Sequence, residues 1–260
     1  MEPEHTLPPN EPALPPEAEP VEAPERYPFW GYGDLLLFAG MALPAMLVGA
    51  ALVSGVVSVL GWRAPNRVFV LLPAQFLGYF LLFLLLWALF RFQYRQPFWR
   101  SLAWVPSGVT PSRLVMGGVA LAFAVALASA ILRTPADIDT PMKELLSDPT
   151  AVVLMAIFGT TLGPLAEELA FRGFMQPLFV RSLGAVPGVL LAALPFGLLH
   201  LQQYGWSWRH GVLITLAGAG FGWVRHRTGS TRAATAMHIA YNCTFFLALV
   251  AQRREFPQTW

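Results

Sequence analysis

The chain has 260 residues and a formal net charge of +2, and 55% of its residues are hydrophobic while only 12% are charged. Because a water-soluble domain spends about a quarter of its residues on charge, this composition excludes an ordinary soluble globular protein. Nothing in the charge indicates a nucleic-acid partner.

The apolar residues come in long runs that follow a polar N-terminal segment. Residues 1–30 are rich in proline and glutamate and cannot bury a core, so we expect a disordered tail. The later runs have about the 20 residues that a helix needs to cross roughly 30 Å of hydrocarbon. They predict membrane-spanning helices at residues 34–62, 68–90, 113–132, 151–180, 185–200, 211–225 and 233–251.

The fourth run is too long for one simple span. It contains Pro164, so a span followed by a second helix is also possible, and the chain then has eight helices instead of seven. Before it, residues 133–150 form the most polar internal segment, part of which can lie at the membrane interface. The sequence contains no internal repeat.

Residues 166–173 read AEELAFRG and place three ionisable groups in this apolar run. An ionisable side chain near the middle of a spanning helix costs about 2.5 to 3.5 kcal/mol on insertion scales, so it must be paired or face a polar cavity. Glu168 and Arg172 are four residues apart and share a helix face, so we expect them to pair. Glu167 is rotated by about 100° from Glu168 and points elsewhere. The alternative is a buried ion pair that only fixes helix packing, or a cluster in water at the interface.

Two further segments place polar groups on one stripe of an apolar helix. PFGLLH contains Phe196 and His200, and HIAYN contains His238 and Asn242, and the members of each pair are at positions i and i+4. A single histidine in such a helix is more often a packing or interfacial residue. Together with Glu167, however, these side chains can supply a general base, a proton partner and oxyanion donors, which water attack on an amide requires.

The three segments resemble, in order, the motifs of the CAAX prenyl protease and bacteriocin-processing family of intramembrane proteases, also called the ABI family. EELAFRG is similar to EExxxR, FGLLH to FxxxH and HIAYN to HxxxN. The similarity implies an all-α, polytopic integral membrane bundle of seven or eight helices around a polar cavity. We therefore divide the chain into a tail (1–30), N-terminal transmembrane helices with the polar loop (31–149), a catalytic region (150–251) and a C-terminal tail (252–260).

The resemblance also implies roles for single residues. Glu167, with His200, matches the pair that activates the attacking water. His238 and Asn242 match the residues that stabilise the oxyanion. The chain is thus expected to be an intramembrane endopeptidase that cleaves a peptide or a membrane-associated protein.

Three more motif residues are expected to support this site. Glu168 and Arg172 complete the first motif, in agreement with the pairing that helix geometry gives. Phe196 is expected to pack beside His200 and to shape the cavity.

Whether a metal takes part is left open by the sequence. Glu167, His200 and His238 form a ligand set that can hold Zn²⁺ with a position left for water. No HExxH pattern is present, and the single cysteine, Cys243, excludes a Cys-based zinc site. The family was first described as metalloproteases and later argued to use a metal-free, glutamate-activated water. We favour the metal-free reading, with no cofactor.

Other membrane functions were weighed against this one. GYGD at residues 31–34 matches the GxGD of aspartyl intramembrane proteases, but no second aspartate lies in a predicted span, so Asp34 is better read as the N-cap of the first helix. No GxSxG nucleophile motif occurs. A transporter would also place charges at mid-membrane, and a non-catalytic scaffold or immunity protein could keep the fold. Apart from the peptide substrate and membrane lipid, no partner is indicated, and the arginine-rich composition is compatible with a bacterial plasma membrane.

Overall fold

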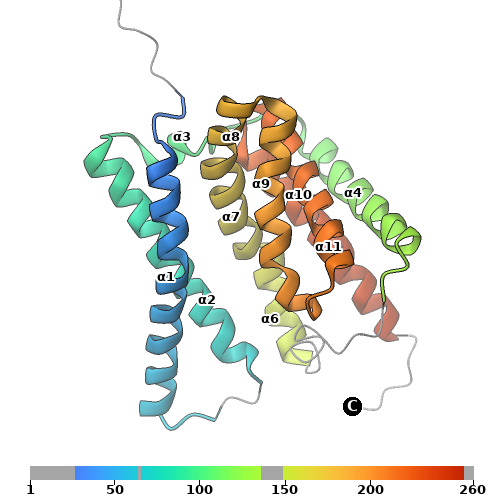
Figure 1. Cartoon of the computed structure of the whole chain (residues 1–260). Helices are drawn as coiled ribbons and strands as arrows, with labels where there is room; N and C mark the ends of the chain where they lie inside the picture. Colours follow the sequence, from blue (N-terminus) through green and yellow to red (C-terminus); the bar gives the residue numbers. More distant parts are fainter. Residues whose placement is uncertain (1–26, 64–65, 136–148, 255–260) are drawn as a thin grey trace, which may run out of the picture.

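The computed structural model describes residues 27–63, 66–135 and 149–254. Within these residues all regular structure is helical, which confirms the predicted all-α class. Five stretches are long and apolar enough to cross a membrane, and they are Tyr32–Val59, Val68–Gln93, Pro111–Ile131, Pro149–Leu183 and Thr231–Ala251. Figure 1 shows the helices as one elongated bundle.

The helices follow one another with short connections in the described part of the chain. In order they are α1 (Tyr32–Val59), α2 (Val68–Ala88) with the π-helix η1 (Leu89–Gln93), α3 (Phe98–Ser101), α4 (Pro111–Ile131), α6 (Pro149–Thr160), α7 (Leu162–Glu168), the π-helix η2 (Leu169–Met175), α8 (Gln176–Leu183), α9 (Ala185–Leu199), the 3-10 helix η3 (Leu201–Tyr204), α10 (Trp208–Thr228) and α11 (Thr231–Arg254).

The long fourth run is divided, but not at the proline. The break lies at Thr161, whose φ of −133° and ψ of −85° are not helical. Pro164 is the third residue of α7, where its missing N–H costs nothing because the first amides of a helix have no intrahelical partner. From Leu162 the chain stays helical through α7, η2 and α8, and so the whole stretch from α6 to α8 occupies one path through the bundle (Figure 1).

Two hydrophobic clusters hold the described bundle together. The first joins α1, α2 and the η2–α8 segment and contains Trp30, Phe90 and Phe174, each with no exposed surface. The second joins α4, α10 and α11 around Phe221 and Met237. Glu168 and Arg172 lie where the two clusters meet, since η2 contributes Leu169 and Phe174 to the first cluster and contacts α10 and α11 of the second.

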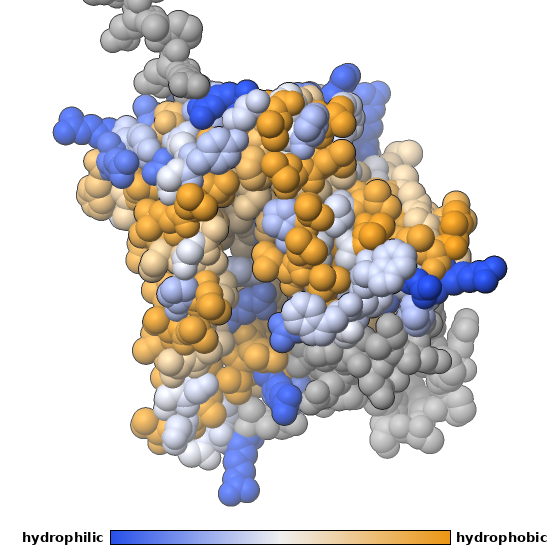
Figure 2. All heavy atoms as spheres, in the orientation of Figure 1, coloured by the Kyte–Doolittle hydropathy of each residue, from blue (hydrophilic) through white to orange (hydrophobic). Residues whose placement is uncertain are grey.

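Large apolar side chains also cover the outside of the bundle. Leu36, Leu47 and Phe123 are each at least 60% exposed, and Figure 2 shows hydrophobic residues over most of the visible face, with hydrophilic ones toward its ends. Lipid tails are as apolar as leucine, so this exposure has no cost in a bilayer. The surface is that of a protein whose helices face lipid.

The N-terminal boundary differs from the sequence-based one. The tail was expected over residues 1–30, but Trp30 is fully buried against Phe174, so the packed structure includes residues 27–30. Asp34 is not the N-cap; Gly31 is, and the Asp34 carboxylate accepts the Gly31 N–H at 2.8 Å from the first turn of α1. At the other end α11 continues to Arg254, three residues into the expected C-terminal tail. Residues 1–26, most of the polar loop (136–148) and residues 255–260 lie outside the described part.

The approach of α1 to α2 yields a stability prediction. A Cβ on Gly49 would lie 2.5 Å from the Ala74 carbonyl oxygen and 2.9 Å from the Gly78 nitrogen, and backbone atoms cannot rotate away. We expect Gly49→Ala to lower the melting temperature in detergent, because overpacking costs about 1–3 kcal/mol and outweighs the helix-propensity gain of up to about 1 kcal/mol.

The control for this prediction is Gly40→Ala in the same helix. Nothing lies within 4 Å of a Cβ at Gly40, so this variant should melt at or above the temperature of the wild type. Equal melting temperatures for the two variants would contradict the close packing of α1 on α2.

Candidate active site

Glu167 and Glu168 end helix α7 and point in different directions, as the helix geometry predicts. The Glu168 side chain has no exposed surface, whereas 18% of the Glu167 side chain is exposed. Glu168 faces Arg172 and the Nδ1 atom of His238. Glu167 faces the Nε2 atoms of His200 and His238. The two adjacent carboxylates therefore have separate surroundings.

The Glu168–Arg172 pair is present and fully buried. Arg172 donates from one guanidinium nitrogen to Glu168 Oε1 at 2.8 Å and from the other to the Gly218 carbonyl of α10 at 2.7 Å. The guanidinium also lies 4.5 Å from the centre of the Phe196 ring, a distance at which a cation is attracted to the ring face. The predicted ion pair is confirmed, and it connects η2 to α10 and α9.

The helix changes type directly after Glu168. Residues 169–175 form the π-helix η2, which is uncommon because its i→i+5 pattern leaves a wider turn, and which occurs often at functional sites. Arg172 lies in this wide segment and is fully buried there with its two acceptors.

His238 of α11 links the two glutamates. Its Nδ1 lies 2.9 Å from Glu168 Oε1 and, because a carboxylate only accepts, donates to it. Its Nε2 then faces Glu167 Oε2 at 3.8 Å. The imidazole is held in this orientation by Phe221 of α10, whose ring stacks on it with centroids 4.3 Å apart and planes 17° apart.

His200 approaches Glu167 from another helix. It follows the last residue of α9, and its Nδ1 lies 2.6 Å from the Phe196 carbonyl, one turn earlier, so that this nitrogen donates. The Nε2 is left facing Glu167 Oε1 at 3.9 Å. The Phe196 ring lies 4.6 Å from the imidazole, so the expected packing of Phe196 beside His200 is confirmed.

The site thus brings together one carboxylate and two imidazole nitrogens from α7, the end of α9 and α11. Separations of 3.8 and 3.9 Å are too long for direct hydrogen bonds but suit a water or substrate oxygen shared between the groups. Because both Nδ1 atoms donate elsewhere, each neutral imidazole turns an unprotonated Nε2 toward Glu167.

Asn242 is placed differently from the other motif residues. Its amide Nδ2 donates to the Gly159 carbonyl of α6 at 2.6 Å, which ties α11 to the helix before the break at Thr161. One amide hydrogen and the side-chain oxygen remain for other partners. The expected oxyanion role of Asn242 stays a prediction.

Three aromatic residues near the site belong to none of the sequence motifs. Tyr79 of α2 lines a groove together with Ala166, the residue before Glu167, and Tyr204 lies in η3, which directly follows His200. Phe221 covers the His238 ring. Their residue types and spacings match many packing residues, so only the fold shows that they surround Glu167 and His238.

Comparison with known proteins agrees with the motif reading. Residues 149–244, from the start of α6 into α11, match the family model described as type II CAAX prenyl endopeptidase Rce1-like. The match covers 96 of the 260 residues and shows what this part of the chain is similar to; we call residues 149–244 the Rce1-like domain. No curated protein and no solved structure gave a match.

The Rce1-like domain contains all seven residues that the motifs singled out, from Glu167 to Asn242. With the five spanning stretches, the match identifies an integral, multi-pass membrane protein. It supports an intramembrane protease of the CAAX type in general.

Zn²⁺ is the metal that the donor types of Glu167, His200 and His238 suit. Among the described residues no group of three or more His, Cys, Asp or Glu side chains is arranged to hold a metal ion. The metal-free reading stays a prediction.

One groove lies beside the segment of the chain that carries Glu167. It has a volume of about 330 Å³ and runs between α2, α3 and the α7–η2 segment. Its lining includes Ala166, the residue before Glu167, and Tyr79 of α2. The rest of its wall is aromatic and aliphatic, with Phe76, Phe80, Phe83, Leu84, Trp87, Phe98, Trp99, Leu162, Leu165 and Leu169.

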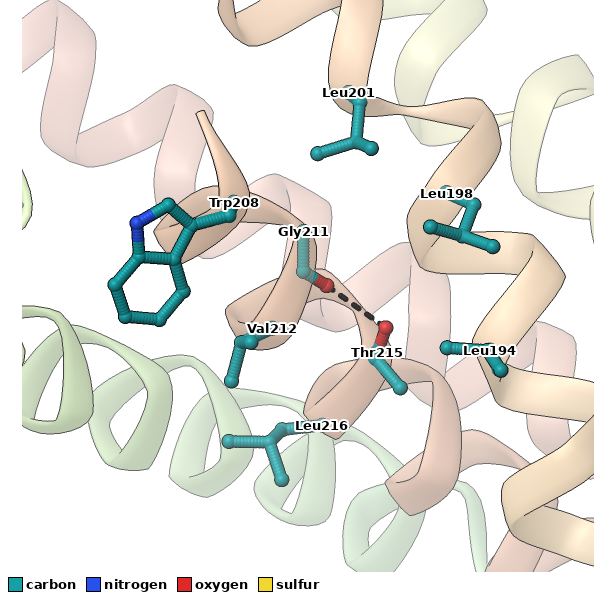
Figure 3. A pocket seen from close by; sticks show the side chains of 8 residues that line it. All are labelled: Leu194, Leu198, Leu201, Trp208, Gly211, Val212, Thr215 and Leu216. Atoms are coloured by element: carbon teal, nitrogen blue, oxygen red, sulfur yellow. Dashed lines mark hydrogen bonds between the residues drawn. The ribbon is translucent and has the colours of Figure 1, made fainter. Parts of the chain in front are cut away.

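A second hollow lies on the outer side of α9 and α10. Its volume is about 310 Å³, and Figure 3 shows leucine side chains facing Trp208 across it. Its only side-chain hydroxyl, that of Thr215, donates to the Gly211 carbonyl at 2.8 Å. The residues that line this hollow are Leu194, Leu198, Leu201, Trp208, Gly211, Val212, Thr215 and Leu216. Because none of them is ionisable, the hollow cannot supply acid–base chemistry.

The buried ion pair of the Rce1-like domain yields a prediction. Arg172→Met should lower the free energy of unfolding by about 3–5 kcal/mol, because it leaves the Glu168 charge buried without its main partner. The double variant Arg172→Met/Glu168→Leu should recover part of this loss, since no charge is then left unpaired in the pair. Thermal unfolding in detergent measures both, and strictly additive losses would contradict a coupled pair.

Proposed function

We propose that the chain is an intramembrane endopeptidase in which Glu167 activates the water that attacks a peptide bond. The observation that carries the proposal is the convergence of the Glu167 carboxylate with the Nε2 atoms of His200 and His238 at 3.9 and 3.8 Å. A hydrolytic water needs a base within hydrogen-bond reach, and Glu167 is the carboxylate of the cluster that lies outside the Glu168–Arg172 ion pair.

In the first step Glu167 accepts a proton from the water, and the water oxygen bonds to the carbonyl carbon of the scissile peptide. The Nε2 of neutral His200 accepts a hydrogen bond from the same water and orients it, because its Nδ1 proton is used by the Phe196 carbonyl. The carbonyl oxygen then carries the negative charge of the tetrahedral intermediate.

We assign His238 to that oxyanion. It can donate from Nε2 while its Nδ1 donates to Glu168 only as the imidazolium ion. In this state the charges of Glu167, Glu168, Arg172 and His238 sum to zero, which suits a site with little contact with water. Asn242, one helical turn from His238 on α11, can donate its second amide hydrogen to the same oxygen.

The intermediate breaks down when the carbon–nitrogen bond is cleaved. The leaving nitrogen takes the proton that Glu167 received from water, directly or through His200, and the products are a carboxylic acid and an amine. Each group returns to its starting protonation state, so no metal and no cofactor is needed to balance the reaction.

The substrate is proposed to enter from the lipid side. The groove between α2 and α7 is apolar along its walls, and its lining includes Tyr79 and Ala166, the residue before Glu167. An apolar chain or side chain of a membrane-associated peptide can lie in it while the scissile bond reaches the carboxylate. The family description makes a prenylated peptide that ends in a CAAX sequence the first substrate to test.

The test compares the wild type with Glu167→Gln. This variant keeps the side-chain volume and removes the base, so it should lose hydrolysis by at least about 100-fold while it melts like the wild type. The purified proteins are assayed with a quenched fluorescent farnesylated CAAX peptide. In a second assay, the wild type or Glu167→Gln is expressed in a strain that lacks the protein. New peptide N-termini in the membranes of the two strains are then labelled and compared by mass spectrometry.

Two outcomes would contradict the proposal. Identical peptide N-termini and equal cleavage for the two folded proteins would favour a scaffold or a transporter, and flux assays would follow. If a chelator inhibits cleavage and added Zn²⁺ restores it, the metal-free reaction would be contradicted, but the assignment as a peptidase would stand.

The role of Asn242 is tested separately with Asn242→Ala. Loss of one oxyanion donor lowers kcat by about 100- to 1000-fold with little change in KM. If Asn242 only ties α11 to Gly159, the variant should instead lower the melting temperature and leave kcat near that of the wild type.

A further inference from the structure

The segment Tyr27–Asp34, which we call the N-terminal strap, is bound to several helices at one end of the bundle. The Tyr27 hydroxyl accepts from Arg225 of α10 at 3.0 Å, and the Tyr32 hydroxyl donates to Ser182 of α8 at 2.8 Å. The Asp34 carboxylate accepts from the Tyr94 hydroxyl at 2.6 Å. The strap contains the GYGD pattern, which the proposed function does not use.

Trp30 is the residue of the strap that reaches the Rce1-like domain. Its indole has no exposed surface and stacks on Phe174, with centroids 5.3 Å apart and planes 20° apart. Its Nε1–H donates to the Phe174 carbonyl at 3.0 Å. Phe174 belongs to η2, two residues after Arg172, so a side chain from outside the family match bonds the backbone of the π-helix.

The opposite side of this segment is bonded to α10. Arg172 donates to the Gly218 carbonyl at 2.7 Å, and Gln176, four residues later, donates to the Gly222 carbonyl at 2.8 Å. The segment formed by η2 and the first residue of α8 is thus bonded to α10 by two long polar side chains, and the Trp30 indole bonds its Phe174 carbonyl. Because π-helical turns are irregular and rare, such bonds fix the register of a segment that could otherwise return to an α-helix.

We propose that Trp30 is a positioning residue: through its bond to the Phe174 carbonyl it holds η2 in the register that places Arg172 on Glu168. Glu168 in turn orients His238 toward Glu167. The inference that this serves catalysis rests on the proposed function, whereas the effect of Trp30 on η2 does not.

The decisive substitutions remove the indole donor and keep the ring. Trp30→Phe retains an aromatic side chain, and replacement of Trp30 by 3-benzothienylalanine at an amber codon retains the full bicyclic shape but has sulfur in place of N–H. The matched control is Tyr27→Phe, which removes the bond from Arg225 elsewhere in the strap and leaves the η2 contacts in place. The benzothienyl variant decides if Trp30→Phe does not fold.

The first readout is hydrogen–deuterium exchange of peptides that cover residues 169–175. Loss of the indole donor should make these amides exchange about five- to tenfold faster, as the loss of one buried hydrogen bond predicts, and Tyr27→Phe should not. Unchanged exchange in the benzothienyl variant would overturn the proposal, whether or not the protein cleaves any peptide.

The second readout is cleavage of the farnesylated CAAX peptide. In the Trp30 variants kcat should fall by about 10- to 100-fold, as misplacement of a supporting group does, while KM changes little. The combination of Trp30→Phe with Glu168→Gln should cost less than the product of the two single effects, because both act through the same pair. Fully additive effects of the two substitutions, or equal kcat in the wild type and the Trp30 variants, would overturn a positioning role. If the wild type cleaves no peptide but the Trp30 variant still exchanges faster over residues 169–175, only the proposed function would be refuted.

Discussion

The contact between Arg172 and Glu168 is the constraint on which the rest of the site depends. A guanidinium and a carboxylate with no exposed surface persist inside an apolar bundle only where each finds further partners. Arg172 uses the Gly218 carbonyl and the face of Phe196, and Glu168 uses the Nδ1–H of His238. A single carboxylate oxygen, Glu168 Oε1, thereby connects η2 with α11, and Arg172 connects the same segment with α10.

This arrangement gives the adjacent residues Glu167 and Glu168 different surroundings and different functions. Glu168 is neutralised and fixed, whereas Glu167 keeps a partly exposed carboxylate between two imidazole nitrogens. The division requires irregular backbone on both sides of α7, with a break at Thr161 before it and the π-helix η2 after it. Irregular helix geometry is acceptable at membrane depth where protein covers it, and η2 is covered by Trp30, which bonds the Phe174 carbonyl, and by α10, to which Arg172 donates.

The N-terminal half of the chain contributes more than membrane anchors. The family match covers residues 149–244, yet α1, α2 and the N-terminal strap share a hydrophobic cluster with Leu169, Phe174 and Leu178. Tyr79 of α2 and Ala166, the residue before Glu167, line the same groove, and α2 forms one wall of it. The environment of the site is thus completed by residues that the motifs do not include.

The membrane class, the approximate spans and the pairing of Glu168 with Arg172 could be predicted from the sequence, because hydrophobic run length and helix periodicity act over short distances along the chain. The motifs also singled out Glu167, His200 and His238, and the Nε2 atoms of the two histidines lie 3.9 and 3.8 Å from the Glu167 carboxylate. The folded structure was needed to show that the break falls at Thr161, that Trp30 is buried on η2, that Phe221 stacks on His238 and that Asn242 bonds Gly159. Each of these depends on contacts between helices far apart in sequence, and since lipid and protein interiors are both apolar, the hydrophobic pattern of a spanning helix does not show which face meets which neighbour.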